Sequence, residues 1–244
     1  MNAVRFDHVS KTFGTRKVLD DLSFDIPKGQ AFCLLGRSGT GKSVALRHII
    51  GLVKADSGRV FVEDRDITTL RGRQLADVRK HMGVLFQNAA LFDSMSVGDN
   101  VSFPMHRHTE WSDDEIRERA MAKLGDVGLD GDFDTMPGDL SGGMKKRVGL
   151  ARAMALDPPL LLADEPSAGL DPITAREIDE LLVKTKQSGT TLVVVTHNIP
   201  SARVVGDSFA LLHQGGMLAS GTIEALDANE EPLVQAFMRA QGSG

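Results

Sequence analysis

The sequence predicts an α/β fold: a mainly parallel sheet, an antiparallel β flank near the N-terminus, and a helical segment inserted in the middle of the chain. Short apolar runs typical of strands alternate with helical patterns, as expected when helices connect parallel strands. A glycine-rich turn joins one of these apolar runs to a helix. Between about residues 92 and 155, by contrast, helix formers dominate and no core strand is evident.

Length and composition agree with a globular protein. The chain has 244 residues, of which 41% are hydrophobic, enough to bury a core and too many for a disordered chain. The formal net charge of -5 gives no excess of basic residues of the kind that binds nucleic acid. The single cysteine, Cys33, excludes an internal disulfide and lies in an apolar run, where we expect a buried thiol.

The sequence predicts a protein without a membrane-spanning helix. No apolar run approaches the roughly 20 residues that such a helix needs. The first residues, Met1 to Arg5, lack the basic and apolar segments of a signal peptide. We therefore expect a cytoplasmic protein, for which any role at a membrane would come through a partner.

Six apolar runs are expected to form strands. Two of them, Val4–Val9 and Val18–Ile26, lie close together near the N-terminus and predict the antiparallel flank. The other four are predicted strands of the core sheet: Ala31–Leu35, Met82–Phe86, Leu160–Ala163 and Thr191–Thr196.

Capping signals mark the helix starts. Ser112 and Glu115 have capping-box spacing, which predicts a helix running to about Leu124. Asp171-Pro172 combines an N-cap with proline at the first helical position, for a helix that ends before Gly189. Two more helices are expected, one over Ser43–Leu52 and one from after Ser141-Gly142-Gly143 to Leu156, where Asp157-Pro158-Pro159 stops it.

These elements predict a single domain over residues 1–241 with a helical insertion. The core lobe would comprise about 1–90 and 157–223, and the helical lobe about 91–156. A C-terminal tail would occupy about 224–244 and present a small apolar face from Leu233, Ala236 and Phe237.

The glycine-rich turn is the first segment that indicates chemistry. Gly36-Arg-Ser-Gly-Thr-Gly-Lys-Ser43 has the spacing G-x-x-x-x-G-K-[ST] between a predicted strand and helix. Its glycines let backbone N–H groups surround phosphate oxygens, and the helix N-terminus adds a positive dipole end. Lys42 can reach the β- and γ-phosphates of a nucleotide, and the Ser43 hydroxyl can ligate Mg²⁺. The segment predicts a P-loop NTPase with a RecA-like core.

Ionisable side chains follow two later strands of this core. Asp164 and Glu165 end the strand at Leu160–Ala163. In a P-loop fold the first carboxylate holds Mg²⁺, and the second can orient or deprotonate the attacking water. His197 follows the strand at Thr191–Thr196, at the sheet edge where α/β proteins bind ligands, so we expect it to contact the γ-phosphate. Solvated acids and a structural histidine are the simpler alternatives.

A second candidate anion site lies at Leu140-Ser-Gly-Gly-Met144, where a serine and two glycines precede a helix. One chain does not need two such sites for one γ-phosphate. The arrangement is explained if this segment serves the nucleotide of a partner chain.

Taken in order, these segments resemble the motifs of the ATP-binding cassette (ABC) transporter family over almost the whole chain. The resemblance rests on the P-loop at Gly36–Ser43, the glutamine loop at Gln87, the signature at Leu140–Met144, the metal–base pair Asp164-Glu165, the D-loop at Ser167–Asp171 and the switch histidine His197.

The resemblance implies a head-to-tail homodimer that binds two ATP molecules, with Mg²⁺, between the P-loop of one chain and the signature of the other. It also implies a role for each matching residue. The residues that would bind ATP are Phe13, Gly36, Arg37, Ser38, Gly39, Thr40, Gly41, Lys42, Ser43 and Val44. The residues that would take part in catalysis are Lys42, Gln87, Glu165 and His197, and those that would ligate the metal are Ser43, Gln87 and Asp164. The partner's nucleotide would be contacted by Ser141, Gly142 and Gly143, and Asp171 would belong to the D-loop.

One residue departs from the family pattern. The family usually stacks a tyrosine on adenine near the first turn, but this chain has no tyrosine, and Phe13 occupies the matching place. Phenylalanine keeps the aromatic face, so stacking is expected to survive. A packing role for Phe13 is the alternative.

Further segments resemble the ATPase subunits of Mla/Mce-type phospholipid transporters. They are 36–52, 85–101, 165–174, 196–198 and the tail 226–237. The resemblance implies a permease dimer in the inner membrane, a periplasmic Mce-domain protein, a STAS-domain protein and a lipid cargo handled by these partners. The chain would then lie peripherally on the cytoplasmic side of the inner membrane. Four residues near Gln87 are expected to form an apolar socket for the permease or to pack the helical lobe: Phe86, Leu91, Phe92 and Met95.

Two other functions remain open. The ATPase of a polar amino-acid importer is the near alternative, because its glutamine-loop segment is similar. An ABC ATPase acting on DNA or ribosomes is disfavoured, because the chain has no coiled-coil insertion or second cassette. Its basic run Lys145-Lys146-Arg147 is short and is interpreted as a solvated helix face. His106 and His108 are expected in a loop, without the ligand spacing of a metal site.

Overall fold

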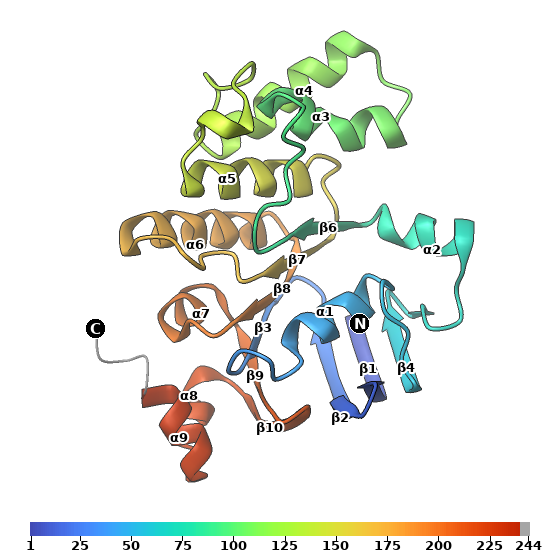
Figure 1. The fold of residues 1–244 in the computed structure, drawn as a ribbon, viewed down its shortest axis with the longest axis vertical. Coiled ribbons are helices and arrows are strands. Elements are labelled where there is room, and N and C mark those ends of the chain that lie inside the picture. The colour runs from blue at the N-terminus through green and yellow to red at the C-terminus, as the bar shows by residue number, and fades with distance from the viewer. Residues whose placement is uncertain (240–244) are drawn as a thin grey trace.

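The computed structural model describes residues 1–239, arranged as two sheets surrounded by helices (Figure 1). The strands are β1 (Asn2–Phe13), β2 (Arg16–Pro27), β3 (Ala31–Leu35), β4 (Ser57–Val62), β5 (Arg65–Asp66), β6 (Met82–Leu85), β7 (Leu160–Asp164), β8 (Thr191–Thr196), β9 (Ser208–His213) and β10 (Gly216–Gly221). The α-helices are α1 (Lys42–Ile49), α2 (Gly72–Arg79), α3 (Val97–His108), α4 (Asp113–Asp126), α5 (Gly142–Ala153), α6 (Pro172–Gln187), α7 (Ile199–Val205), α8 (Ile223–Asp227) and α9 (Pro232–Arg239).

The larger sheet confirms the predicted parallel core. Its order is β10-β9-β3-β8-β7-β6, and every pairing from β9 to β6 is parallel, whereas β10 pairs antiparallel with β9 at the edge. The four predicted core strands are β3, β6, β7 and β8, and they lie next to one another in the sheet in the order β3-β8-β7-β6. The ends of β3, β7 and β8 therefore lie side by side, where the candidate catalytic residues follow them.

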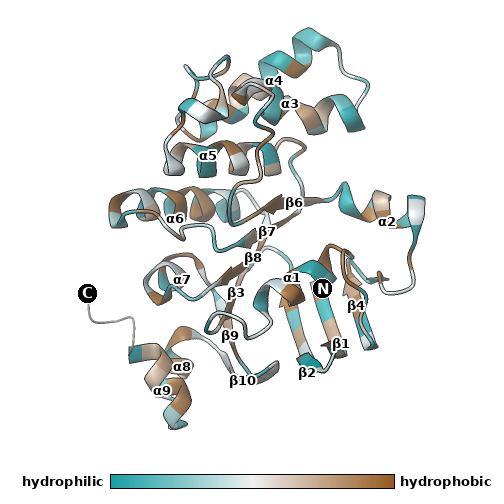
Figure 2. Ribbon diagram, viewed as in Figure 1, coloured by the Kyte–Doolittle hydropathy of each residue, from teal (hydrophilic) through white to brown (hydrophobic). Residues whose placement is uncertain are grey.

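Alternating side chains of the core strands divide the interior into two hydrophobic layers. Ala31, Cys33 and Leu35 of β3 contact the layer that includes α5, α6 and α7. Phe32 and Leu34 face the opposite layer, which includes α1 and the N-terminal strands. Figure 2 shows the same pattern, with apolar central strands and more polar outer helix surfaces. A strand that is apolar on both sides reads as a continuous apolar run, which is why these strands were recognisable in the sequence.

The smaller sheet confirms the antiparallel flank and extends it. Its order is β2-β1-β4-β5, with antiparallel pairing throughout. Strands β4 and β5 were not predicted. Helix α1 lies between the two sheets (Figure 1), and Ala45, Leu46 and Ile49 of this helix are buried there.

Helices α3, α4 and α5 pack on one another at the end of the molecule away from the antiparallel sheet (Figure 1). Helix α4 has the predicted capping box between Ser112 and Glu115. Helix α3 was missed, although Ser96 and Asp99 form a capping box at its start. The division of the chain into a core lobe, a helical lobe and a tail stays a prediction.

Two local predictions in this region were wrong. His106 and His108 belong to the last turn of α3 and not to a loop. Helix α5 ends at Ala153 and not at Leu156, because residues 154–156 already form the turn that leads into β7. The turn closes at Asp157, whose φ of +48° is incompatible with a continuing helix.

The chain ends in two short helices, α8 and α9. Val234 and Phe237 of α9 are buried against the chain's own interior, whereas Leu233 is exposed. The last part of the predicted tail, residues 240–244, lies outside the described residues. Within residues 1–239, no helix is both long and apolar enough to cross a membrane.

Candidate functional site

The loop between β3 and α1 has a backbone that only glycine can adopt at two places. Gly36 has a φ of +152°, and a Cβ on it would lie 2.7 Å from the carbonyl oxygen of Leu212. Gly41 has a φ of +107°, and its Cβ would lie 2.6 Å from the carbonyl oxygen of Val18. These glycines let the loop fold closely against its neighbours at the start of α1, in the form of an anion-binding turn.

Lys42 is the first residue of α1, and its side chain reaches back to the loop. Its Nζ donates hydrogen bonds to the carbonyl oxygens of Gly36 at 2.8 Å and Arg37 at 3.2 Å. It also lies 3.6 Å from Oε1 of Glu165. The side chain is buried, and desolvation lowers the pKa of its ammonium, an effect opposed by the Glu165 carboxylate. The structure thus holds a cation where the loop would receive a phosphate.

The side chains of Ser43 and Asp164 are in contact next to this loop, although 121 positions separate the two residues in the chain. The Ser43 hydroxyl donates to Oδ1 of Asp164 at 2.9 Å. Burial raises the pKa of the Asp164 carboxyl, and the hydrogen bond from Ser43 opposes this shift. A hydroxyl and a carboxylate side by side next to a phosphate loop are a donor set that fits Mg²⁺, which prefers oxygen ligands.

Glu165 is held by several groups at the end of β7. Its Oε1 lies 2.9 Å from Nδ1 of His197, and its Oε2 accepts hydrogen bonds from the Thr196 hydroxyl at 3.1 Å and the His197 N–H at 3.4 Å. Glu165 is 9% exposed. The β7 and β8 strand ends therefore bring the predicted base and the switch histidine into direct contact.

Lys146 corrects the interpretation of Lys145-Lys146-Arg147 as a solvated face. Its side chain is buried, and Nζ donates to the backbone carbonyl oxygen of Glu165 at 3.0 Å. Desolvation lowers the pKa of this ammonium, while Glu165 and Asp164 oppose the shift. Helical spacing could have revealed this orientation, because Gly143, Lys146 and Leu150 fall on one face and all three are buried.

The signature residues form the start of α5. Ser141 is the N-cap and accepts a hydrogen bond from the Met144 N–H at 3.2 Å. Ser141 and Gly142 are exposed, whereas a Cβ on Gly143 would lie 2.3 Å from Cγ2 of Thr174 on α6. The two glycines therefore leave an accessible helix N-terminus that packs closely on the next helix.

The remaining predicted residues are not joined to the Lys42–Glu165 cluster. Among residues 1–239, no hydrogen bond or ion pair links Gln87, Ser141 or Asp171 to Lys42, Ser43, Asp164 or Glu165. Gln87 lies just after β6 and is exposed. Asp171 caps α6, accepting from the Ile173 and Thr174 N–H groups. Phe13 is 47% exposed at the end of β1, with Nζ of Lys11 5.3 Å from its ring centroid.

A buried acid lies behind the D-loop. Ser167 of this loop and Ser201 of α7 are hydrogen-bonded at 3.1 Å. Asp179 of α6 is 4% exposed, and its Oδ1 has no hydrogen-bond partner within the described part of the chain. Burial raises the pKa of its carboxyl to about 6, although a hydrogen bond with Ser201 opposes the shift.

Asp179→Asn is expected to stabilise the protein in a pH-dependent way. The folded-state pKa lies above the ordinary value of 3.8, so the folded protein binds this proton more tightly than the unfolded chain. The group's contribution to the free energy of unfolding therefore falls as pH rises from about 4 to about 6. The variant should gain on the order of 2 kcal/mol at pH 8 and less at pH 5. Urea unfolding at both pH values measures this, with Asp93→Asn, the same change at an exposed aspartate, as control. Equal gains at both pH values would contradict it.

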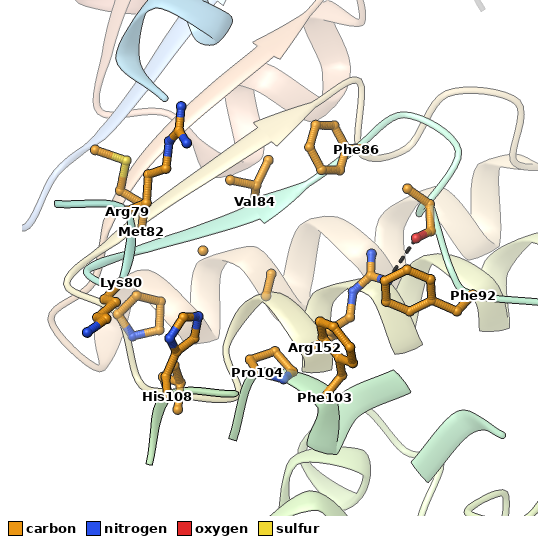
Figure 3. A pocket seen from close by; sticks show the side chains of 15 residues that line it. Arg79, Lys80, Met82, Val84, Phe86, Phe92, Phe103, Pro104, His108 and Arg152 are labelled. Atoms are coloured by element: carbon orange, nitrogen blue, oxygen red, sulfur yellow. Dashed lines mark hydrogen bonds between the residues drawn. The ribbon is translucent and has the colours of Figure 1, made fainter. Parts of the chain in front are cut away.

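A groove opens beside Gln87, between β6, α3 and the end of α5 (Figure 3). Phe92 and Phe103 pack with ring centroids 5.0 Å apart, and the Arg152 guanidinium lies 5.8 Å from the Phe92 centroid. Arg152 also donates to the carbonyl oxygens of Ala89 at 2.6 Å and Ala90 at 2.8 Å, which fixes the segment after Gln87.

The predicted apolar socket is found only in part at this groove. Phe86 and Phe92 line the groove, but Leu91 packs against the interior and Met95 lies outside the groove. Helix α3 contributes Phe103, Pro104 and His108 to its wall. Phe86, Phe92 and Phe103 are each partly exposed, so the groove presents aromatic surface to solvent.

Comparison with known proteins places this chain in a family. The family described as ABC transporter matches residues 19–168. The probable ribonucleotide transport ATP-binding protein mkl of Mycobacterium leprae is 41% identical over 243 residues, which cover 99% of this chain and 70% of that protein. The intermembrane phospholipid transport system ATP-binding protein MlaF of Escherichia coli is 38% identical over 244 residues, covering 100% of this chain and 91% of that protein.

Solved structures of ATP-binding cassettes share the fold. A dimeric cassette in a post-hydrolysis state bound to ADP and Pi superposes with a TM-score of 0.84 and 32% identity, covering 90% of this chain and 98% of that one. The ADP conformation of a cassette from an ABC transporter gives a TM-score of 0.85 with 28% identity, covering 97% of this chain and 98% of that one. The chain belongs to the ABC transporter family and is one of its ATP-hydrolysing subunits.

Proposed function

We propose that the chain powers a transporter that moves phospholipid between the inner and outer membranes. The observation that carries this proposal is its 38% identity to MlaF over the full chain and 91% of that protein. The name of mkl, ribonucleotide transport, leaves a different cargo as the second candidate. Both candidates share the same motor, because the cluster of Lys42, Ser43, Asp164, Glu165 and His197 acts on the nucleotide and not on the cargo.

The proposed chemistry is hydrolysis of the γ-phosphate by a water that Glu165 orients and deprotonates. Its Oε1 is already bonded to His197, and the nearby Lys42 ammonium can stabilise charge on the γ-phosphate. When bound, Mg²⁺ would neutralise charge on the phosphate oxygens, and Ser43 and Asp164, with Gln87 as the third predicted ligand, are the residues that would hold it.

The active form is proposed to be a homodimer in which each ATP lies between two chains. The helix N-terminus at Ser141-Gly142-Gly143 is accessible through Ser141 and Gly142. Within residues 1–239, no hydrogen bond or ion pair joins it to the cluster of its own chain. A phosphate on a partner's P-loop is a suitable ligand for it. The dimeric cassettes among the solved structures support this assembly.

The groove beside Gln87 is proposed as the docking site of the permease. It exposes three aromatic rings and is also lined by Arg152, and aromatic residues and arginine are the residue types that anchor protein interfaces. The permease dimer would hold the chain on the cytoplasmic side of the inner membrane. An Mce-domain protein and a STAS-domain protein are proposed as further partners from the resemblance to Mla/Mce systems.

Phe103→Asp is expected to release the chain from its permease. A carboxylate in the wall of this groove would be desolvated without a partner on docking, so the amount of co-purified permease should fall about 10-fold or more. The measurement is mass spectrometry of proteins that co-purify with the chain from gently solubilised native membranes. Met121→Asp, an equally exposed site on α4, is the matched control, and the melting temperatures of both variants check folding.

The same experiment separates the candidate functions. A multispanning permease together with an Mce-domain protein would support lipid transport. A permease with a periplasmic solute-binding protein would favour import of a polar solute. Ribosomal or DNA-associated proteins without a permease would overturn the transport proposal and leave the ATPase chemistry in place.

A further inference from the structure

We infer that Lys146 is a positioning residue for ATP hydrolysis: from the signature helix, it holds the backbone of Glu165 in the conformation that the reaction requires. The inference rests on the proposed role of Glu165 as the base. It assigns a function to a buried cation that belongs to neither the phosphate loop nor the metal site.

The contact is made at the backbone of Glu165. Lys146 Nζ donates to the Glu165 carbonyl oxygen at 3.0 Å, and the Ala168 N–H donates to the same oxygen at 3.2 Å. On the other side of the residue, the Glu165 N–H donates to the Val195 carbonyl oxygen at 2.8 Å. Both peptide groups flanking Glu165 are therefore fixed, one by β8 and the other by Lys146 and the D-loop turn.

Glu165 needs this support because its own backbone is unfavourable. Its φ is +49°, in the left-handed region that non-glycine residues rarely occupy and keep only when their surroundings enforce it. This conformation turns the chain at the end of β7 and sends the carboxylate toward His197 and Lys42. Without a donor on the carbonyl oxygen, the peptide after Glu165 would be freer to rotate and would carry the carboxylate with it.

A packing role alone does not account for a lysine at this place. Lys146 is 5% exposed, and no carboxylate of the described chain lies within ion-pair distance of its Nζ. Its hydrogen-bond partner is a neutral carbonyl oxygen. Desolvating an ammonium is costly, and an apolar side chain of similar length would fill the same space without that cost. What the apolar side chain would lack is the hydrogen bond to Glu165.

The position of Lys146 also connects two parts of the proposed reaction. Ser141, which is proposed to contact the partner's nucleotide, begins the same helix only five residues earlier, a rise of about 7.5 Å at 1.5 Å per residue. One rigid helix therefore carries both the contact to the partner's ATP and the donor that holds this chain's own Glu165. If binding of the partner's nucleotide displaced this helix, Lys146 would move with it and would shift Glu165, the proposed base of this chain's own site.

Lys146→Met tests the inference, because it keeps the length of the side chain and removes the donor and its charge. We expect kcat to fall about 100-fold, the loss typical of a misplaced catalytic group, while the Kd for ATP and the melting temperature stay close to those of the wild type. Lys146→Arg, which keeps an N–H donor, should lose less than about 10-fold. Lys184→Met, the same change at an exposed lysine of α6, is the matched control.

Three outcomes would overturn the inference. One is an unchanged kcat in Lys146→Met alongside an inactive Glu165→Gln. Another is a parallel loss of kcat, ATP affinity and melting temperature in both Lys146 variants, which would indicate a structural role only. The third is full activity of Glu165→Gln, which would show that Glu165 is not the base and would overturn the proposed chemistry together with the inference. The first two outcomes would overturn only the role of Lys146.

Discussion

Glu165→Gln is expected to bind ATP and to lower the rate of hydrolysis by about 10³-fold, within the range found for loss of a general base. The amide keeps the size of the side chain and can still meet the Thr196 hydroxyl and His197, so the fold should persist. It cannot accept a proton from water. Because the bound ATP is then not consumed, the variant should accumulate as an ATP-bound dimer. Phosphate release measures the rate, and size-exclusion chromatography with ATP measures the dimer.

Glu180→Gln is the matched control for this change. Glu180 is exposed on α6, and within residues 1–239 its ion pair is with Arg176 one turn away, so hydrolysis should be unaffected. Wild-type turnover in Glu165→Gln would remove Glu165 from the role of base. Loss of hydrolysis without a stable ATP-bound dimer would instead indicate that the charge of Glu165 is also needed to hold the nucleotide site together.

The parts of the site that follow strand ends could be predicted from the sequence. Gly36–Ser43 is a local motif, so its spacing alone determines a loop that wraps an anion. Asp164 and His197 follow apolar runs, and parallel strands bring their ends to one edge of the sheet. Contact between the Ser43 hydroxyl and Asp164 follows from strand order, because β8 alone separates β3 from β7.

Features that depend on helix orientation or on weak local signals could not be predicted in the same way. Helix α3 was missed because its capping box uses Asp99 and because Pro104 interrupts its pattern. The left-handed conformation of Glu165 has no signature in residue type, since it is enforced by contacts from β8 and α5. Lys146 was interpreted as solvated because charge runs usually are, and its helical spacing from the buried Gly143 and Leu150 is a weak signal beside that pattern.

A mixture of Lys42→Ala and Ser141→Ala chains is expected to recover nucleotide trapping that neither variant shows alone. Lys42 belongs to the phosphate loop of its own chain, whereas Ser141 is proposed to serve the partner. In a mixed dimer one site carries both defects, and the other combines an intact loop with an intact signature. At equal amounts, about half of the dimers are mixed, so about a quarter of the sites should trap nucleotide.

The measurement is vanadate-trapped radioactive nucleotide as a function of the mixing ratio, and the expected curve is symmetric with its maximum at equal amounts. Lys184→Ala in place of Ser141→Ala provides the control, because a surface lysine should leave one intact site in mixed dimers and two in its own homodimers. No recovery at any ratio would argue against a shared site. Trapping by Ser141→Ala alone at the wild-type level would place the signature outside the nucleotide site, and the accessible N-terminus of α5 would then need a different ligand.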